Sequence, residues 1–277
     1  MKQASQGWSY LLTYYQALNK LVCLGGLPRS GTTWLGTILN QNPRFYVTGP
    51  SPFVELLWRN YALWDDPAYI SDLQADDLGD MRIPYLRKLT NLYYNHLTNC
   101  NIIIDNRRAW QSATNIEMFT QVFGVTPKII CPVRNVEEII SSYIKMFERN
   151  DLEWNYYTSM KGNIFEDSYA QLKESYNSTH RKSLLLVEYE DLVNNLDLSL
   201  DNIYNFIEEP RYKHDVNTIK INESYNKVAE KYGLVGLHDT KSGVVKSVTR
   251  ATDILTKDQF SEFSKLTFWR DEHQKNN

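Results

Sequence analysis

LVCLGGLPRSGTTWLGT, residues 21–37, is the stretch that decides the fold of this 277-residue chain. Its apolar run at 21–24 has the length of a short buried strand, and apolar residues recur at helical spacing from Trp34 onward. The loop between them directs several backbone N–H groups at the start of a helix, an arrangement that binds anions. Because the loop also carries the cation Arg29, the sequence predicts a site for a phosphate or sulfate ester.

The glycines of this loop have the spacing of a Walker A loop, GxxxxGK[ST], in which a lysine follows the second glycine and reaches the phosphates. Gly26 and Gly31 fit that spacing, but Thr32 stands where the lysine is required. The cation lies two residues before Gly31, at Arg29. We therefore expect a nucleotide with a different charged end, and a P-loop kinase acting on a small molecule is the alternative that the missing lysine disfavours.

The segment PRSGTTWL, residues 28–35, resembles the 5′-phosphosulfate loop of the sulfotransferases that use 3′-phosphoadenosine 5′-phosphosulfate (PAPS). That loop reads P-[KR]-S-G-T-[TS]-W/F-L, and all eight positions agree. The resemblance implies in-line transfer of the sulfuryl group from PAPS to an acceptor hydroxyl, with Trp34 packed on the adenine. It also implies that the 5′-phosphosulfate is held by Arg29, Ser30, Gly31, Thr32 and Thr33, and that Arg29 stabilises charge on the leaving phosphate.

A second motif, CPVRNVEEIISSY at 131–143, predicts a strand that ends at Arg134 and a helix that follows. Asn135 is the expected N-cap, with Glu138 three residues later completing a capping box. Ser142 lies eight residues after Arg134, two turns into the helix. In the family that the first motif resembles, this pair clamps the 3′-phosphate of PAPS, so we expect ATP to bind poorly.

A third motif, VEYEDLVNN at 187–195, resembles the Y-E-D-L segment of the same family and implies that Tyr189 touches the nucleotide. The family also has a C-terminal R-K-G loop that grips the 3′-phosphate, and this chain has no such string. The nearest basic, glycine-containing segment is residues 236–250, which makes Lys241, Ser242 and Arg250 candidates for that role.

The catalytic base is less clearly marked. Relatives use a His shortly after the third strand or a Glu after the second, and the segment IIIDNRRAW at 102–110 has no His. We therefore expect Glu55 to accept the proton of the acceptor hydroxyl, with Asp105 as the alternative. Asp105 would otherwise orient Arg107 or Arg108, one of which would stabilise the sulfuryl group.

Short apolar segments that alternate with helical patterns predict a parallel sheet covered by helices on both faces. The expected fold is a three-layer α/β/α sandwich like the P-loop nucleotide-binding folds, with strands at 21–24, 45–49, 101–105, 128–134 and 183–189. We expect a single domain over residues 1–277, with helical and loop insertions around 56–98 and 145–180. Residues 7–19 fit a short amphipathic helix on the sheet.

Composition limits the function further. The net charge of −3 gives no electrostatic basis for nucleic-acid binding. No signal peptide or run of transmembrane length is visible, so we expect no integral membrane segment and a cytoplasmic protein. No cluster of metal ligands appears, and no metal is expected. The acceptor stays open among small-molecule, carbohydrate and peptide hydroxyls, and a catalytically inactive PAPS-binding protein is a second alternative.

Overall fold

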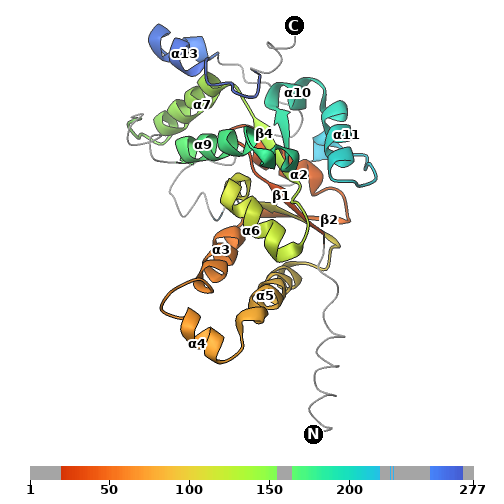
Figure 1. Ribbon diagram of the computed structural model, residues 1–277. Coiled ribbons are helices and arrows are strands. Elements are labelled where there is room, and N and C mark those ends of the chain that lie inside the picture. The colour runs from red at the N-terminus through yellow and green to blue at the C-terminus, as the bar shows by residue number, and fades with distance from the viewer. Residues whose placement is uncertain (1–19, 155–163, 219–224, 226, 228–249, 271–277) are drawn as a thin grey trace.

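A computed structural model describes residues 20–154, 164–218, 225, 227 and 250–270. Its centre is a five-stranded parallel sheet with the order β2-β3-β1-β4-β5 (Figure 1). The strands are β1 (Lys20–Leu24), β2 (Phe45–Pro50), β3 (Ile102–Asn106), β4 (Ile129–Val133) and β5 (Leu184–Glu188). The predicted parallel sheet and its five strands are confirmed, while the helix expected at 7–19 lies outside the described residues.

The central strands are buried on both faces because alternate side chains enter two separate hydrophobic cores. Cys23 and Ile103 belong to one core, whereas Val22 and Ile104 belong to the other. All five residues of β3 and of β4 are buried. This double burial explains why the strands read as continuous apolar runs rather than as alternating patterns.

Helices form the two outer layers. One face of the sheet packs against α3 (Phe53–Leu63), α5 (Arg82–Leu97), α6 (Ala113–Phe123), α7 (Val136–Arg149) and α9 (Ile164–Tyr176). The other face packs against α2 (Thr32–Leu39), α10 (Tyr189–Asn194) and α11 (Leu196–Phe206). The three-layer α/β/α architecture predicted from the sequence is therefore confirmed.

The first predicted insertion, around 56–98, is helical. It contains most of α3, then α4 (Ile70–Ala75), the 3₁₀ turn η1 (Gly79–Met81) and α5, which Figure 1 shows below the sheet. Neither α4 nor η1 buries a residue, so this aspartate-rich part of the insertion lies on the surface. Of the second insertion, the described residues form the end of α7, α9 and part of η3 (Thr179–Ser183).

The C-terminal described segment, residues 250–270, begins with the 3₁₀ turn η5 (Ala251–Asp253) and continues into α13 (Lys257–Phe263). Shorter 3₁₀ turns are η2 (Arg108–Gln111) and η4 (Val216–Thr218). In Figure 1, α13 lies beside α7. None of the helices in the described part of the chain combines the length and apolar composition needed to cross a membrane.

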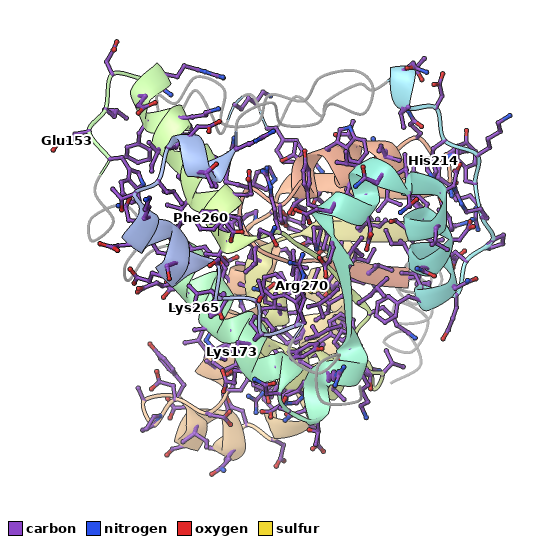
Figure 2. All side chains as sticks on the ribbon, turned by 90° about the horizontal axis from the view of Figure 1, so that it is seen from above. Glu153, Lys173, His214, Phe260, Lys265 and Arg270 are labelled. Atoms are coloured by element: carbon purple, nitrogen blue, oxygen red, sulfur yellow. The ribbon has the colours of Figure 1, made fainter. Side chains whose placement is uncertain are left out.

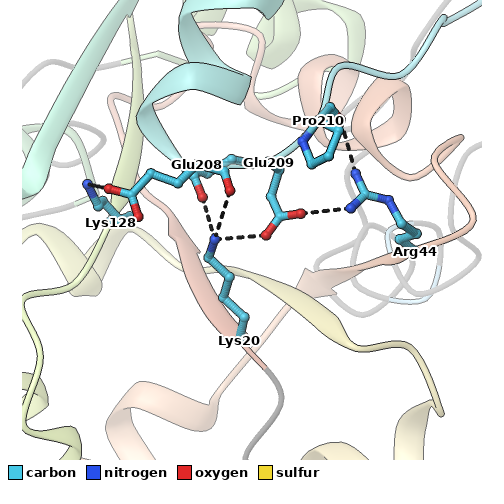
Figure 3. Close-up of polar contacts among 7 residues, drawn as sticks. Lys20, Arg44, Lys128, Glu208, Glu209 and Pro210 are labelled. Atoms are coloured by element: carbon cyan, nitrogen blue, oxygen red, sulfur yellow. Dashed lines mark hydrogen bonds and ion pairs between the residues drawn. The ribbon is translucent and has the colours of Figure 1, made fainter.

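An ionic network ties the amino ends of three strands to the loop after α11 (Figure 3). Lys20 Nζ donates to Glu209 Oε1 at 2.8 Å, and Arg44 Nη1 to Glu209 Oε2 at 2.7 Å, while Lys128 pairs with Glu208 at 3.1 Å. Burial alone would raise the pKa of Glu209, but the hydrogen bonds from Lys20 and Arg44 together lower that pKa. The network secures the sheet at the edge opposite the site described next.

Candidate functional site

The loop after β1 is held against β4 by backbone pairing that continues past the end of the strand. Gly25 N–H donates to Ile130 O at 2.8 Å and Leu27 N–H to Pro132 O at 2.9 Å. Between them Gly26 has a φ of 92°, and a Cβ at this position would lie 2.3 Å from Pro132 O. Only glycine permits both this backbone conformation and this close approach.

The second half of the loop turns into α2. Arg29 and Gly31 both have positive φ values, 60° and 86°, and the first helical hydrogen bond runs from Leu35 N–H to Gly31 O at 2.9 Å. The N–H groups that precede Leu35 therefore take no part in the hydrogen-bond ladder of α2 and surround its positive end. This geometry is that of an anion site.

Ser30 contributes to this loop from the inside. Its side chain is fully buried, and its hydroxyl donates to Leu27 O and to Pro132 O, the latter at 2.8 Å. The hydroxyl thus fixes the loop against β4. Thr32 and Thr33 are half-buried at the start of α2.

Five residues singled out in the sequence meet around this loop. Arg29 Nε donates to Ser142 Oγ at 3.0 Å. Arg134 Nη1 lies 3.4 Å from the carbonyl oxygen of Arg29, and its guanidinium stacks over the Tyr189 ring at 4.4 Å. The same ring lies against Gly31, where an added Cβ would be 3.0 Å from Tyr189 Cδ2. Three separate motifs thus build one site at the carboxyl edge of the sheet.

Arg134 is nearly buried and only partly neutralised. Its Nη2 pairs with Glu138 Oε2 at 3.2 Å, while its buried Nε has no hydrogen-bond partner among the described residues. A buried donor without an acceptor is costly unless a ligand supplies one. The orphaned Nε therefore fits a phosphate oxygen.

The capping box predicted for α7 is wrong. Asn135 does stand at the N-cap, but its side chain makes no capping hydrogen bond. Its Oδ1 accepts instead from Arg270 Nη1 at 2.7 Å. Glu138 pairs with Arg134, and its second oxygen accepts from Ala251 N–H at 3.2 Å. Tertiary partners have replaced both local bonds of the box.

Glu55 lies in the first turn of α3, just after the carboxyl end of β2. Its Oε1 accepts from Arg107 Nε at 2.6 Å, and its Oε2 is buried without a hydrogen-bond partner among the described residues. One carboxylate oxygen is thus anchored by Arg107, and the other keeps its capacity to accept a hydrogen bond. Both side chains are about two-fifths exposed, 39% for Glu55 and 42% for Arg107, so the pair is open to ligands.

Asp105 occupies a different environment. It is fully buried, and its Oδ1 accepts from the indole N–H of Trp110 at 2.7 Å. Burial raises the pKa of Asp105, and its polar neighbours Ser51, Trp110 and Tyr94 oppose the rise. Asp105 therefore braces the sheet edge from within, and its indole contact takes the place of the expected contact with Arg107 or Arg108.

Arg108 has no ion pair or hydrogen bond within the described part of the chain. Burial lowers its pKa, as does Arg107 to a smaller extent, while Tyr143 opposes the shift. Burial raises the pKa of Tyr143, and the charges of Arg108 and Arg29 oppose the rise, so both arginines act electrostatically on this hydroxyl. A buried guanidinium with no anionic partner among the described residues is a second feature that fits an anionic ligand.

Of the remaining predicted site residues, some lie in the described part of the chain and others do not. Trp34 is partly buried against the core on the α2 side of the sheet. Arg250 is exposed and precedes η5, whereas Lys241 and Ser242 lie outside the described residues. In the described part of the chain, no group of three or more His, Cys, Asp or Glu side chains is placed to hold a metal ion.

Two residues near the site have no counterpart in the sequence predictions. The buried hydroxyl of Tyr225 accepts a hydrogen bond from Asn106 Nδ2 and shares another with the Thr33 side chain. Burial raises the pKa of Tyr225 to about 12. Arg270 holds Asn135 and Glu188, the neighbours of Arg134 and Tyr189. Neither belongs to a motif, because each reaches the site only through tertiary packing.

Three comparisons with known proteins were made. A family model described as the sulfotransferase family matches residues 22–214. The sulfotransferase domain of the Synechococcus PCC 7002 olefin synthase is 16% identical, with a TM-score of 0.49 over 90% of this chain and 95% of that chain. Mouse sulfotransferase SULT7A1, complexed with PAP, is 14% identical, with a TM-score of 0.49 over 95% of this chain and 88% of that chain. Retinol dehydratase in a complex with retinol and PAP is 12% identical, with a TM-score of 0.46 over 91% and 81%. No curated protein sequence matches the chain.

Proposed function

Because the chain belongs to the sulfotransferase family, we propose that it transfers the sulfuryl group of PAPS to an acceptor hydroxyl. The observation that carries the proposal is the meeting of Arg29, Arg134, Ser142 and Tyr189 around Gly31. PAPS has an anion at each end of its ribose, a 5′-phosphosulfate and a 3′-phosphate. The site offers a loop and helix N-terminus for one and a nearly buried arginine for the other.

In this proposal the loop residues bind the 5′-phosphosulfate. The backbone N–H groups of residues 29–33 surround it, and the hydroxyls of Thr32 and Thr33 add donors. Trp34 packs on the adenine and Tyr189 on the nucleotide. Lys241 is the candidate for a further contact to the 3′-phosphate from the C-terminal part of the single domain that we propose for the whole chain.

Arg134 and Ser142 bind the 3′-phosphate and so select PAPS over ATP. The support for this assignment is the buried Nε of Arg134, which needs an acceptor, and the Ser142 hydroxyl, which Arg29 holds at 3.0 Å. A phosphate placed there would receive charge-assisted hydrogen bonds, each worth about 1.5 to 3 kcal/mol.

The transfer step needs a base and cations. The acceptor oxygen forms a bond to sulfur while the bond from sulfur to the bridging oxygen breaks, and the electron pair leaves with adenosine 3′,5′-bisphosphate. The acceptor proton goes to Glu55 Oε2, since Arg107 already holds Oε1. Arg29 stabilises the leaving phosphate and Arg108 the sulfuryl oxygens, so this chain's own residues supply the positive charge.

Binding and turnover together test this function. We expect calorimetry to show adenosine 3′,5′-bisphosphate binding at least tenfold more tightly than Mg²⁺-ATP. We also expect release of the bisphosphate from PAPS when small-molecule, carbohydrate or peptide hydroxyls are screened as acceptors. Tighter binding of Mg²⁺-ATP would favour a kinase, and bisphosphate binding without any turnover would favour a catalytically inactive PAPS-binding protein.

A further inference from the structure

Arg270, which is labelled in Figure 2, bridges the carboxyl ends of the neighbouring strands β4 and β5. Its Nε lies 3.1 and 3.0 Å from the two carboxylate oxygens of Glu188, its Nη2 also donates to Glu188, and its Nη1 donates to Asn135 Oδ1 at 2.7 Å. All three guanidinium nitrogens are thus used within the protein. Hydrogen bonding to Glu188 raises the pKa of Arg270, so the charge on the bridge is retained.

The two residues that Arg270 holds flank two residues of the proposed nucleotide site. Val133 and Glu188 are register partners at the carboxyl ends of β4 and β5. The next residue on each strand is Arg134 on one side and Tyr189 on the other, and their side chains stack at 4.4 Å. Asn135 follows Arg134, and Glu188 precedes Tyr189. A bridge between Asn135 and Glu188 therefore fixes the spacing of the stacked pair.

The backbone that carries Arg270 is itself anchored. Phe268 and Trp269 are both 6% exposed, and the Phe268 ring contacts Tyr169 and Tyr176 of α9 at 5.3 and 5.4 Å between centroids. The same C-terminal segment makes a second contact with the site, from Ala251 N–H to Glu138 Oε1. Since Glu138 Oε2 pairs with Arg134, the segment reaches Arg134 by two routes.

We propose that Arg270 is a positioning residue for the 3′-phosphate site: by holding Asn135 and Glu188 it fixes Arg134 against Tyr189 in the geometry that receives the phosphate. This inference rests on the proposed function, because it takes Arg134 as the ligand of the 3′-phosphate. Arg270 acts through Arg134 rather than on the nucleotide, since each of its three guanidinium nitrogens already donates to Glu188 or Asn135. Misplacement of such a group by a fraction of an ångström is enough to weaken binding.

A double-mutant cycle tests the proposal. Calorimetry on the full chain measures the affinity for adenosine 3′,5′-bisphosphate and for adenosine 5′-phosphate in the wild type, Arg270→Ala, Arg134→Ala and the double variant. We expect Arg270→Ala to weaken the bisphosphate about tenfold and the 5′-phosphate less than twofold. In the Arg134→Ala background the same change should weaken the bisphosphate less than twofold, because the residue it positions is gone.

Two further variants control for general damage to the fold. Asn135→Ala removes one of the two acceptors and should give an intermediate loss, about threefold, while leaving the Arg270–Glu188 pair in place. Arg211→Ala also removes an arginine that bridges two acceptors, Asp197 and Asp201, but these lie on α11, and bisphosphate affinity should be unchanged. Arg270→Lys should recover part of the affinity by keeping the charge beside Glu188.

The outcomes separate this inference from the function on which it rests. A wild type that binds both nucleotides equally refutes the 3′-site and this inference with it. A wild type that prefers the bisphosphate, together with an Arg270→Ala variant of unchanged affinity, refutes the positioning role alone. Equal losses for both nucleotides, or a full loss that persists in the Arg134→Ala background, also refute it.

Discussion

Gly26→Ala probes the close approach between the anion-binding loop and β4. The added Cβ would lie 2.3 Å from Pro132 O, 2.7 Å from Pro132 N and 2.8 Å from Pro132 Cδ. Two of these atoms are backbone in a fully buried strand, so no flexible side chain can move aside. The φ of 92° adds conformational strain, since alanine disfavours this region.

The size of the effect follows from these contacts. Positive φ in a residue with a Cβ costs about 1 to 2 kcal/mol, and overpacking adds about 1 to 3 kcal/mol. The lower entropy of the unfolded alanine chain offsets about 0.4 to 1 kcal/mol. We therefore expect the free energy of unfolding to fall by about 1 to 4.6 kcal/mol. The hydrogen bond from Gly26 N–H to Gln111 Oε1, 2.6 Å long, would be displaced as well.

Urea denaturation followed by circular dichroism measures this change. Gly79→Ala is the matched control, because a Cβ at that position meets nothing within 4 Å and its φ is not in the left-handed region. The control should be neutral or more stable by up to about 1 kcal/mol. If Gly26→Ala lost less than about 0.5 kcal/mol, or matched the control, the close approach would have no energetic importance and the reasoning would fail.

The other predictions concern the site and the opposite edge of the sheet. Arg134→Ala should weaken adenosine 3′,5′-bisphosphate by about 2 kcal/mol and adenosine 5′-phosphate by far less, because it removes charge-assisted bonds to the 3′-phosphate only; equal losses in calorimetry would remove Arg134 from that role. Glu55→Gln should lower turnover about 10²- to 10⁴-fold with bisphosphate affinity unchanged, and an active Glu55→Gln enzyme would transfer the base role to another group. Glu209→Gln should destabilise the protein by about 1 kcal/mol at pH 7. Since the folded pKa of Glu209 is lowered, the stabilisation exists above the unfolded pKa and disappears as the pH falls through the folded pKa. The free energies of unfolding of the wild type and Glu209→Gln should therefore converge in acid. A difference between them that grew in acid would contradict a stabilising role for the ionic network.

Local sequence information was sufficient for the sheet and for the loop. Buried parallel strands require continuous apolar runs, and the glycines at 26 and 31 are required by backbone geometry that no other residue adopts without strain. The pairing of Arg134 with Ser142 came from the family resemblance, and the structure adds that Ser142 accepts a hydrogen bond from Arg29 at 3.0 Å.

Tertiary contacts account for what the sequence did not reveal. Asn135 and Glu138 have the spacing of a capping box, yet Arg270 and Arg134 bind them instead, because charged partners form stronger hydrogen bonds than backbone N–H groups do. Arg270 lies 135 residues from Asn135 in the chain, so no local sequence pattern predicts the contact. Asp105 ends a strand and was the alternative base, and the sequence did not reveal that it is fully buried and accepts a hydrogen bond from Trp110.

The central claim, that this site binds a 3′-phosphorylated adenylate, is tested most directly by a crystal structure with adenosine 3′,5′-bisphosphate. We predict that the 5′-phosphate lies at the backbone N–H groups of residues 29–33 and that the 3′-phosphate lies within hydrogen-bond distance of Arg134 and Ser142. A nucleotide bound elsewhere, or a 3′-phosphate that avoids Arg134, would contradict it.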